Sequence, residues 1–168
     1  MKFKIPDGFR PEKVCRKVGG SSLGSDDPYL VGGCLMATDG CMAVLLPDCA
    51  PGALDGTVPR KALAEARKSG SSSIIELEVE DAEVLAGGER FVREAPGRDV
   101  RQVIPQGSPC GVSDIAFDAD KMRRLLEAMG CDVVSFKTFG PLKPIELEGK
   151  TEDGTTVIGL IMPYRLRV

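Results

Sequence analysis

Residues 157–166 read Val157-Ile158-Gly159-Leu160-Ile161-Met162-Pro163-Tyr164-Arg165-Leu166. On its own this stretch is an apolar strand that ends at a proline, which cannot donate a ladder hydrogen bond. Three other stretches precede it, and none contains an obvious catalytic group: Ala37-Thr38-Asp39-Gly40, Val58-Pro59-Arg60-Lys61 and Asp99-Val100-Arg101-Gln102-Val103-Ile104-Pro105. Together the four stretches indicate a protein that binds other macromolecules and performs no chemistry.

The composition is that of an ordinary soluble globular protein. The chain has 168 residues, of which 42% are hydrophobic and 28% are charged, and it is long enough to bury a core. No apolar run approaches the roughly 20 residues that span a bilayer. The N-terminus, residues 1–6, is too short and too charged for a signal peptide. We therefore expect a cytoplasmic protein that makes no membrane contact.

The sequence disfavours an enzyme because it contains no histidine, the usual general base and activator of a nucleophile. A cysteine thiolate or a carboxylate pair such as Asp118 and Asp120 remains as an alternative source of chemistry. None of the six cysteines has C-x-x-C spacing, so we expect buried thiols and no zinc site. Since there is also no glycine-rich phosphate loop, we expect neither catalysis nor a cofactor.

The net charge of −3 conceals two basic clusters. One lies in residues 10–17 and one in residues 60–68, and each contains a single acid, whereas acids gather in residues 76–83. The cations of the two clusters are Arg10, Lys13, Arg16 and Lys17, then Arg60, Lys61, Arg67 and Lys68. A mildly acidic protein can therefore still present one basic face to nucleic acid.

The first third of the chain predicts strands and one weak helix. Residues 3–5 read as a strand, residues 11–18 as a weak basic helix, and residues 29–46 as a hairpin that turns at Thr38-Asp39-Gly40.

The middle third predicts a helix that begins at Pro59 and ends before Gly70. Its four cations share one face, opposite Ala62, Leu63 and Ala66.

Three strands follow that helix, at residues 74–79, 83–85 and 90–93. In the first of them Ile75, Leu77 and Val79 alternate with glutamates, which predicts one buried face and one solvent-exposed face.

The last third repeats this order. It predicts a strand at residues 115–117, a helix capped by Asp118 and ended by Gly130, and strands at residues 133–137, 144–148 and 157–162. Met122, Leu125, Leu126 and Met129 form the apolar stripe of the helix. The middle and last thirds share one unit, a strand, a helix and three antiparallel strands, and the first third is a reduced version of it.

Taken together, the four stretches resemble the bacterial DNA polymerase III beta subunit, the sliding clamp. The first three resemble successive parts of the middle domain of that family, and residues 117–166 resemble the final half of its last domain. The resemblance implies an α+β fold of repeated β-α-β-β-β units, with antiparallel sheets outside and helices on one face. It also implies a division into a clamp-like domain, residues 1–107, and a further half-unit, residues 108–168.

The resemblance implies a function in DNA replication or repair, as a processivity factor that oligomerises around duplex DNA. Helices of such a ring hold phosphates without reading sequence. The candidate residues for this lining are Arg60, Lys61, Arg67, Lys68, Lys121, Arg123 and Arg124. An ordinary solvated helix face is the alternative interpretation of these cations. Since family rings contain about twelve units, three units in a chain imply roughly a tetramer.

The resemblance also implies an apolar pocket that binds short linear motifs of polymerases and repair proteins. The matching residues are Thr38, Gly40, Cys41, Met42, Ala43, Pro105, Leu142, Pro144, Leu160, Met162 and Pro163. The family places a His-Arg-Leu triplet after its Asp-Gly turn, whereas this chain has Cys41-Met42-Ala43, so its pocket is expected to be more apolar. The same residues would also serve as plain hairpin and core.

Two interpretations of the function remain open at this stage. The chain is either a short clamp that forms a ring around DNA, or a non-encircling adaptor or decoy that retains only the peptide pocket. Two half-domains of the family have no counterpart in these residues, which favours the adaptor, whereas a retained basic helix face favours the ring.

Overall fold

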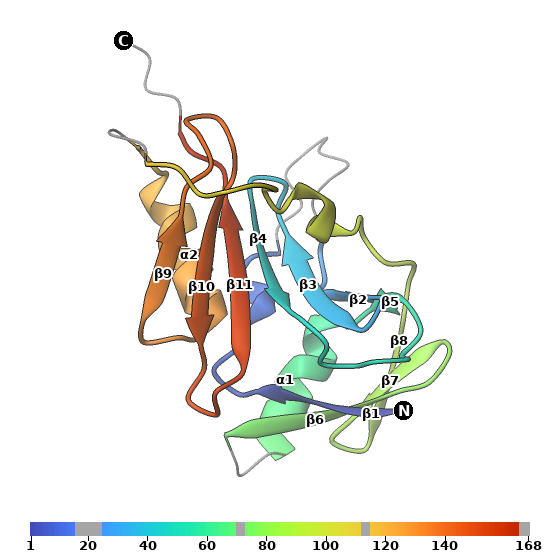
Figure 1. Cartoon of the computed structure of the whole chain (residues 1–168). Helices are drawn as coiled ribbons and strands as arrows, with labels where there is room; N and C mark the ends of the chain where they lie inside the picture. Colours follow the sequence, from blue (N-terminus) through green and yellow to red (C-terminus); the bar gives the residue numbers. More distant parts are fainter. Residues whose placement is uncertain (16–24, 70–72, 112–114, 165–168) are drawn as a thin grey trace.

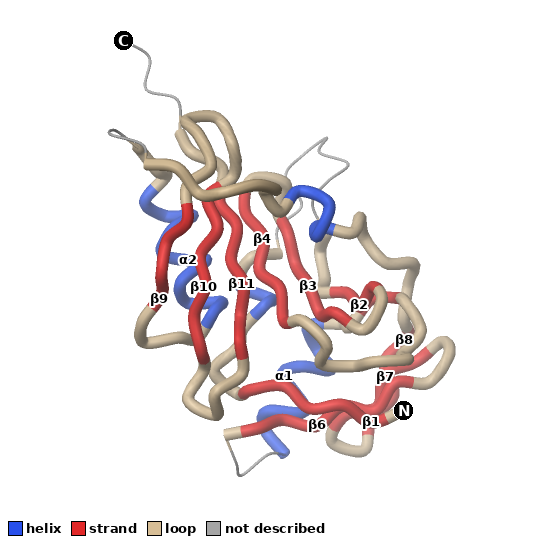
Figure 2. The backbone as a smooth tube through the Cα atoms, viewed as in Figure 1, coloured by secondary structure: helices blue, strands red, loops and turns tan. Residues whose placement is uncertain are grey.

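The computed structural model describes residues 1–15, 25–69, 73–111 and 115–164, and these fold into two antiparallel sheets (Figures 1 and 2). The four-stranded sheet has the order β1 (Lys2–Pro6), β6 (Ile74–Val79), β7 (Glu83–Ala86) and β8 (Glu89–Val92). The seven-stranded sheet has the order β5 (Gly56–Thr57), β2 (Tyr29–Val31), β3 (Cys34–Thr38), β4 (Met42–Leu46), β11 (Thr156–Ile161), β10 (Ile145–Lys150) and β9 (Val134–Lys137).

The elements fall into three units in chain order. The first unit contains β1, the 3-10 helix η1 (Pro11–Lys13) and β2–β4. The second contains β5, α1 (Arg60–Ser69) and β6–β8, and the third contains residues 115–117, α2 (Ala119–Met129) and β9–β11. The first and second units exchange their opening strands, because β1 pairs with β6 and β5 pairs with β2. The third unit joins the first through antiparallel pairing of β11 with β4.

The two helices begin differently. Asp118 caps α2, where its carboxylate accepts hydrogen bonds from the backbone N–H groups of Asp120 and Lys121 at 3.0 and 3.1 Å. In α1 the corresponding acceptor comes from a distant loop, since Asp27 Oδ1 accepts from the N–H of Arg60 at 2.8 Å. α1 therefore depends on the loop before β2 as well as on its own sequence.

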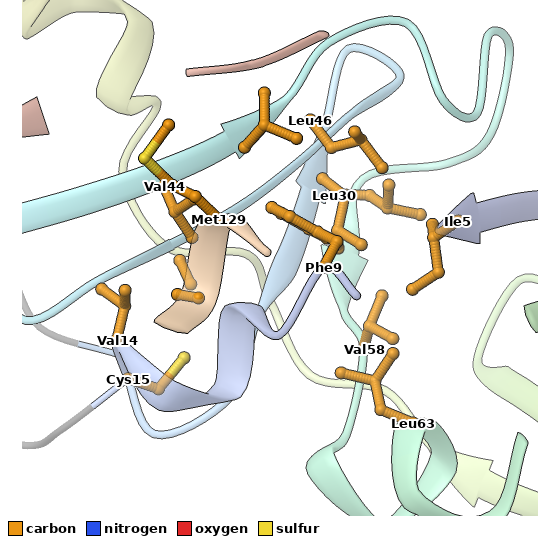
Figure 3. Packing of buried hydrophobic residues seen from close by; sticks show 14 of the residues in the cluster. Ile5, Phe9, Val14, Cys15, Leu30, Val44, Leu46, Val58, Leu63 and Met129 are labelled. Atoms are coloured by element: carbon orange, nitrogen blue, oxygen red, sulfur yellow. The ribbon is translucent and has the colours of Figure 1, made fainter. Parts of the chain in front are cut away.

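The main core lies between the sheets and the helices and includes residues of all three units. Figure 3 shows Ile5 and Phe9 of the first unit, Leu63 of α1 and Met129 of α2 in this cluster. A smaller cluster lies on the other face of the seven-stranded sheet and consists of Tyr29, Cys34, Met36, Ala43, Leu45, Val100 and Leu160. The seven-stranded sheet is thus covered by apolar contacts on both faces near its centre.

The predicted α+β class, antiparallel sheets and repeated units are confirmed by these elements. The predicted alternation in β6 is also confirmed, since Ile75, Leu77 and Val79 are buried. No helix within the described residues is long and apolar enough to cross a membrane.

Three local predictions were wrong. Of the helix expected at residues 11–18, the described part forms only η1, and residues 16–18 lie outside the described residues. Gly70, which was expected to follow the end of the middle helix, also lies outside them. The strand expected at residues 115–117 is reduced to a single bridge between Ala116 and Tyr164. Residues 29–46 form three strands, not a simple hairpin, because Gly32 and Gly33 make a further turn with φ of 55° and 77°.

The end of α2 generates a stability prediction. Gly130 closes the helix with φ of 62°, and a Cβ at this position would lie 2.0 Å from the carbonyl oxygen of Gly8. We expect Gly130→Ala to lower the free energy of unfolding by at least about 3 kcal/mol, because left-handed strain and a clash with rigid backbone add. Urea unfolding measures this change.

The matched control is Gly154→Ala. Gly154 has φ of 84°, and a Cβ added there would meet no other atom within 4 Å, so only the backbone strain of about 1–2 kcal/mol applies. Equal losses of stability for the two variants would contradict close packing of Gly130 against Gly8.

Candidate functional site

An apolar cavity of about 490 Å³ lies where β4 meets β11. Its walls come from the β3–β4 turn, from β4, from the end of β11 and from the 3-10 helix η2 (Val100–Val103). The lining residues are Thr38, Gly40, Cys41, Met42, Ala43, Val100, Val103, Pro144, Leu160, Ile161 and Met162. Since Thr38 supplies the only side-chain hydroxyl in this set, the cavity suits an apolar ligand segment.

The turn between β3 and β4 is held by its own side chains. The Asp39 carboxylate accepts hydrogen bonds from the N–H groups of Cys41 and Met42, each at 2.9 Å. The Thr38 hydroxyl donates to the carbonyl of Met42 at 2.8 Å and accepts from the N–H of Gly40 at 3.0 Å. These bonds fix the backbone that forms one wall of the cavity.

A salt bridge connects this turn to α2. Asp39 is buried, and its carboxylate lies 3.8 Å from the guanidinium of Arg124. Arg124 also donates to the carbonyls of Lys13 and Val14, both at 3.1 Å. One guanidinium thus ties together the wall of the cavity, α2 and the end of η1.

The opposite walls come from β11 and η2. Beyond β11, the N–H of Met162 donates to the carbonyl of Cys41 at 2.9 Å, which continues the β4–β11 pairing to the cavity. Asp99 caps η2 by accepting from the N–H of Arg101 at 3.0 Å. The cap positions Val100, which is buried against the sheet, and Val103, which is exposed.

The structure brings together most of the pocket residues predicted from the sequence. Eight of them line the cavity, whereas three do not: Pro105, Leu142 and Pro163. Sequence reasoning missed Val100, Val103 and Ile161. The first two are spaced i, i+3 directly after a capping aspartate, and this spacing was the available signal for a short 3-10 helix that presents two valines on one side.

A larger cavity of about 810 Å³ lies beside Gly8, Gly130 and the start of β9. It is open to solvent, and its lining contains five acids: Asp7, Asp132, Glu148, Glu152 and Asp153. Such a surface repels phosphate groups, and it lacks the mainly apolar lining that ligand pockets usually have. The smaller cavity has such a lining and is therefore the better candidate site.

The predicted basic face is divided in the structure. Arg60 donates to the carbonyls of Asp26 at 2.6 Å and Cys15 at 2.5 Å. Arg67 is largely buried, and it donates to Glu12 at 2.6 Å and to the carbonyl of Phe9 at 2.9 Å. Together with Arg124, these two arginines hold the N-terminal segment in place.

The geometry of Arg67 fits this structural role. Its Nε lies 3.6 Å from Asp7 Oδ1, near enough for an ion pair but too far for a hydrogen bond. Its guanidinium therefore faces two carboxylates of the first unit, Asp7 and Glu12, and points away from solvent.

The remaining cations are more exposed. Lys68 pairs with Glu65 at 2.9 Å, and Arg123 pairs with Asp120 and Glu127 at 2.8 and 2.5 Å. Exposed helix pairs of this kind contribute little to stability, and a ligand can displace them. Within the part of the chain that the structure describes, Lys61 and Lys121 form no ion pair.

Three of the six thiols, those of Cys15, Cys34 and Cys49, are not arranged for nucleophilic chemistry. Burial raises the pKa of Cys15 and of Cys49 to about 12 and that of Cys34 to about 11, so these thiols remain protonated near neutral pH. Asp118, one of the carboxylates considered above, serves as the cap of α2. Among the described residues, no cluster of cysteine and acidic side chains could hold a metal ion.

Solved structures with the same fold are bacterial sliding clamps. Matches include the beta sliding clamp of Caulobacter crescentus with PEG bound (TM-score 0.63, 15% identity), the DNA polymerase III subunit beta of Bartonella birtlesii bound to griselimycin (0.66, 14%) and the Bacillus subtilis clamp (0.63, 14%). They cover 98–99% of this chain, which spans only 65–66% of theirs. No family model and no curated protein matches the sequence. The chain therefore has the sliding-clamp fold.

The partly buried ion pairs of Arg67 generate a prediction that separates structural cations from solvent-facing ones. We expect Arg67→Met to lower the free energy of unfolding by about 2–3 kcal/mol, because Glu12 and Asp7 lose a partly buried partner. Chemical denaturation measures the change. Lys61→Met is the matched control on the same helix, with an expected effect within about 0.5 kcal/mol. Equal effects would show that Arg67 is as free as Lys61.

Proposed function

We propose that this chain is a clamp-like protein of DNA replication or repair that binds short apolar segments of polymerases or repair proteins. The observation that carries the proposal is the cavity at the β4–β11 joint. Eight of the residues that the clamp resemblance implied for peptide binding line this one space. The matched clamps with bound PEG and bound griselimycin support a ligand-binding surface on this fold. The proposed setting is the cytoplasm.

The chemistry of the cavity defines the partner. Its walls contain methionine, valine, leucine and isoleucine side chains and no cation. A ligand therefore gains affinity by burying two or three large apolar side chains. Because Cys41, Met42 and Ala43 replace a more polar triplet, we propose a preference for peptides without an acidic anchor.

The second part of the proposal is a homo-oligomer around duplex DNA, with residues 1–107 as one clamp-like domain and residues 108–168 as a half-unit. Four chains would supply twelve units. The cations available to phosphates are those of α1 and α2 that are not bonded inside the protein. Lys61 and Lys121 come first, and Lys68 and Arg123 follow after displacement of their surface partners.

One observation favours the alternative, a non-encircling adaptor or decoy. Arg60, Arg67 and Arg124 are among the seven cations predicted to line a ring, and all three are engaged by the chain's own backbone or carboxylates. The positive charge left for DNA is smaller than the sequence suggests. An adaptor needs only the peptide cavity, which a single chain completes.

The cavity generates a binding prediction. We expect Met162→Glu and Val103→Glu each to weaken peptide binding at least about tenfold, because the peptide would have to desolvate a new carboxylate. Both side chains line the cavity and are exposed, at 44% and 53%, so the fold tolerates the change. The probes are labelled pentapeptides with two adjacent leucine or phenylalanine residues, compared by fluorescence anisotropy with serine-substituted versions.

Leu142→Glu is the matched control. Leu142 is 58% exposed and was predicted for the pocket from the sequence, yet it does not line the cavity. Its substitution should leave the affinity unchanged. A loss of affinity with Leu142→Glu but not with Val103→Glu would contradict the site, and the absence of binding by every apolar peptide would contradict the proposed function.

The helix cations generate a separate prediction for DNA. We expect Lys61→Glu combined with Lys121→Glu to weaken salt-sensitive binding of duplex DNA, and to reduce the slope of log affinity against log salt by about 0.9 for each phosphate that the variant no longer neutralises. Anisotropy of labelled duplex at several salt concentrations measures the slope. Lys2→Glu combined with Lys4→Glu changes the charge equally on the exposed face of β1 and is the control. Absence of DNA binding by the unmodified protein would favour the adaptor.

A further inference from the structure

The first and second units complete each other by exchanging strands. β1 of the first unit lies beside β6, the strand that follows α1, in the register Phe3 opposite Leu77. β5 of the second unit lies beside β2 in return, with Thr57 opposite Tyr29. The strand that opens each three-stranded meander, β2 or β6, therefore has a neighbour on both sides.

Within the described residues, the third unit contains both halves of such an exchange, and neither half takes part in one. β9 is the equivalent of β2 and β6, yet among the described residues it pairs only with β10 and forms the edge of the seven-stranded sheet (Figure 2). Residues 115–117 are the equivalent of β5. The N–H of Tyr164 donates to Ala116, and the N–H of Thr57 donates to Glu94, so both opening segments are tied to the end of their own unit.

Beyond the acidic cavity at its start, β9 is accompanied by exposed apolar side chains where the other units are covered. Val133 and Phe136 are 80% and 52% exposed, and Leu126 of α2, the helix behind β9 in Figure 1, is 36% exposed. In α1 the apolar residues Ala62, Leu63 and Ala66 are all buried. Exposed apolar side chains beside an unpaired strand edge mark a surface that pairs with another chain.

The charged residue within β9 itself does not oppose pairing. Lys137 is the charged residue of β9, and it is neutralised within the sheet by Glu146 and Glu148 of β10, at 2.8 and 2.5 Å. The strand that closes the second unit, β8, is also an edge, and it carries two charged residues, Glu89 and Arg90, of which Arg90 pairs with Glu80 and Glu83 at 3.0 and 2.7 Å. Charged residues on an edge strand protect it from association. β9 is therefore better suited to a partner than β8.

We propose that β9 and residues 115–117 form a twofold contact between two copies of this chain. In this contact β9 of each copy accepts the opening segment of the other copy, as β6 accepts β1 and β2 accepts β5 within one chain. A second copy is the favoured occupant because the third unit offers one donor segment and one acceptor edge. Under a twofold axis, the donor segment of each copy pairs with the acceptor edge of the other, so that no donor or acceptor is left over. Two third units would thus make one complete pair.

The inference rests on the homo-oligomer of the proposed function but not on its DNA or peptide binding. A dimer of this kind contains six units in the order second, first, third, third, first, second, with a β8 edge at each end. Two such dimers would supply the twelve units of a ring. The β9 contact comes first because it buries the more apolar edge.

Analytical ultracentrifugation of the full chain over a wide concentration range tests the contact. We expect an assembly of at least two 17.9 kDa chains, and we expect Phe136→Lys and Val133→Lys each to raise the dissociation constant at least about tenfold. Val92→Lys is the matched control, because Val92 is 72% exposed on the β8 edge. This control should leave the β9 dimer intact.

A photo-cross-linking residue at position 136 tests the pairing itself. In a mixture of unlabelled and ¹⁵N-labelled chains, we expect cross-links between copies to residues 115–117. Products mapped to the β8 edge would overturn the contact while the homo-oligomer survived. A protein that remains monomeric at about 100 µM, far above the dissociation constant of a specific dimer, would overturn both. Peptide affinity, measured on Phe136→Lys, is independent of either outcome.

Discussion

The antiparallel pairing of β4 with β11 is the interaction on which the rest of the structure depends. It places Leu160 opposite Ala43 and Ile161 opposite Met42, and so joins the third unit to the first in one sheet. The same pairing aligns the β3–β4 turn with the end of β11, which creates the apolar cavity between them. Gly159 on β11 lets α2 pack closely, since a Cβ there would lie 2.7 Å from the Sδ of a methionine of α2. The sheet, the core and the cavity thus all depend on the β4–β11 pairing.

Arginines make the second set of connections, and they explain why an acidic chain keeps basic clusters in its helices. Arg60, Arg67 and Arg124 reach residues 7–15 from two helices and satisfy the carbonyls and carboxylates of that segment. A short 3-10 helix leaves carbonyl groups without intrahelical partners. Guanidinium groups with several donors suit this task better than lysine. The positive charge that periodicity assigns to one face is therefore partly structural.

The sequence predicted most of the strands, both helices and most of the cavity because strong local signals decide these features. Alternation defined β6, and Asp118 and Gly130 defined α2. The features that sequence reasoning missed depend on tertiary partners. The two residues of β5 are too few for a pattern, and residues 115–117 have the composition of a strand but form only one bridge. Helical periodicity placed Arg67 on a charged face, but it could not show that carboxylates of the first unit lie against that face.

The cavity needs only one chain, whereas a ring needs several chains that meet at their strand edges. β4, β11 and η2 belong to one chain, so a monomer already contains every wall of the cavity. Encirclement of DNA needs copies that meet at strand edges, and such contacts depend on concentration. Of the two proposed activities, peptide binding is therefore the one that a single chain could support, and a ring would add to it by assembly. A chain that did not assemble at its strand edges would still contain the cavity, whereas one without the β4–β11 pairing would lose it.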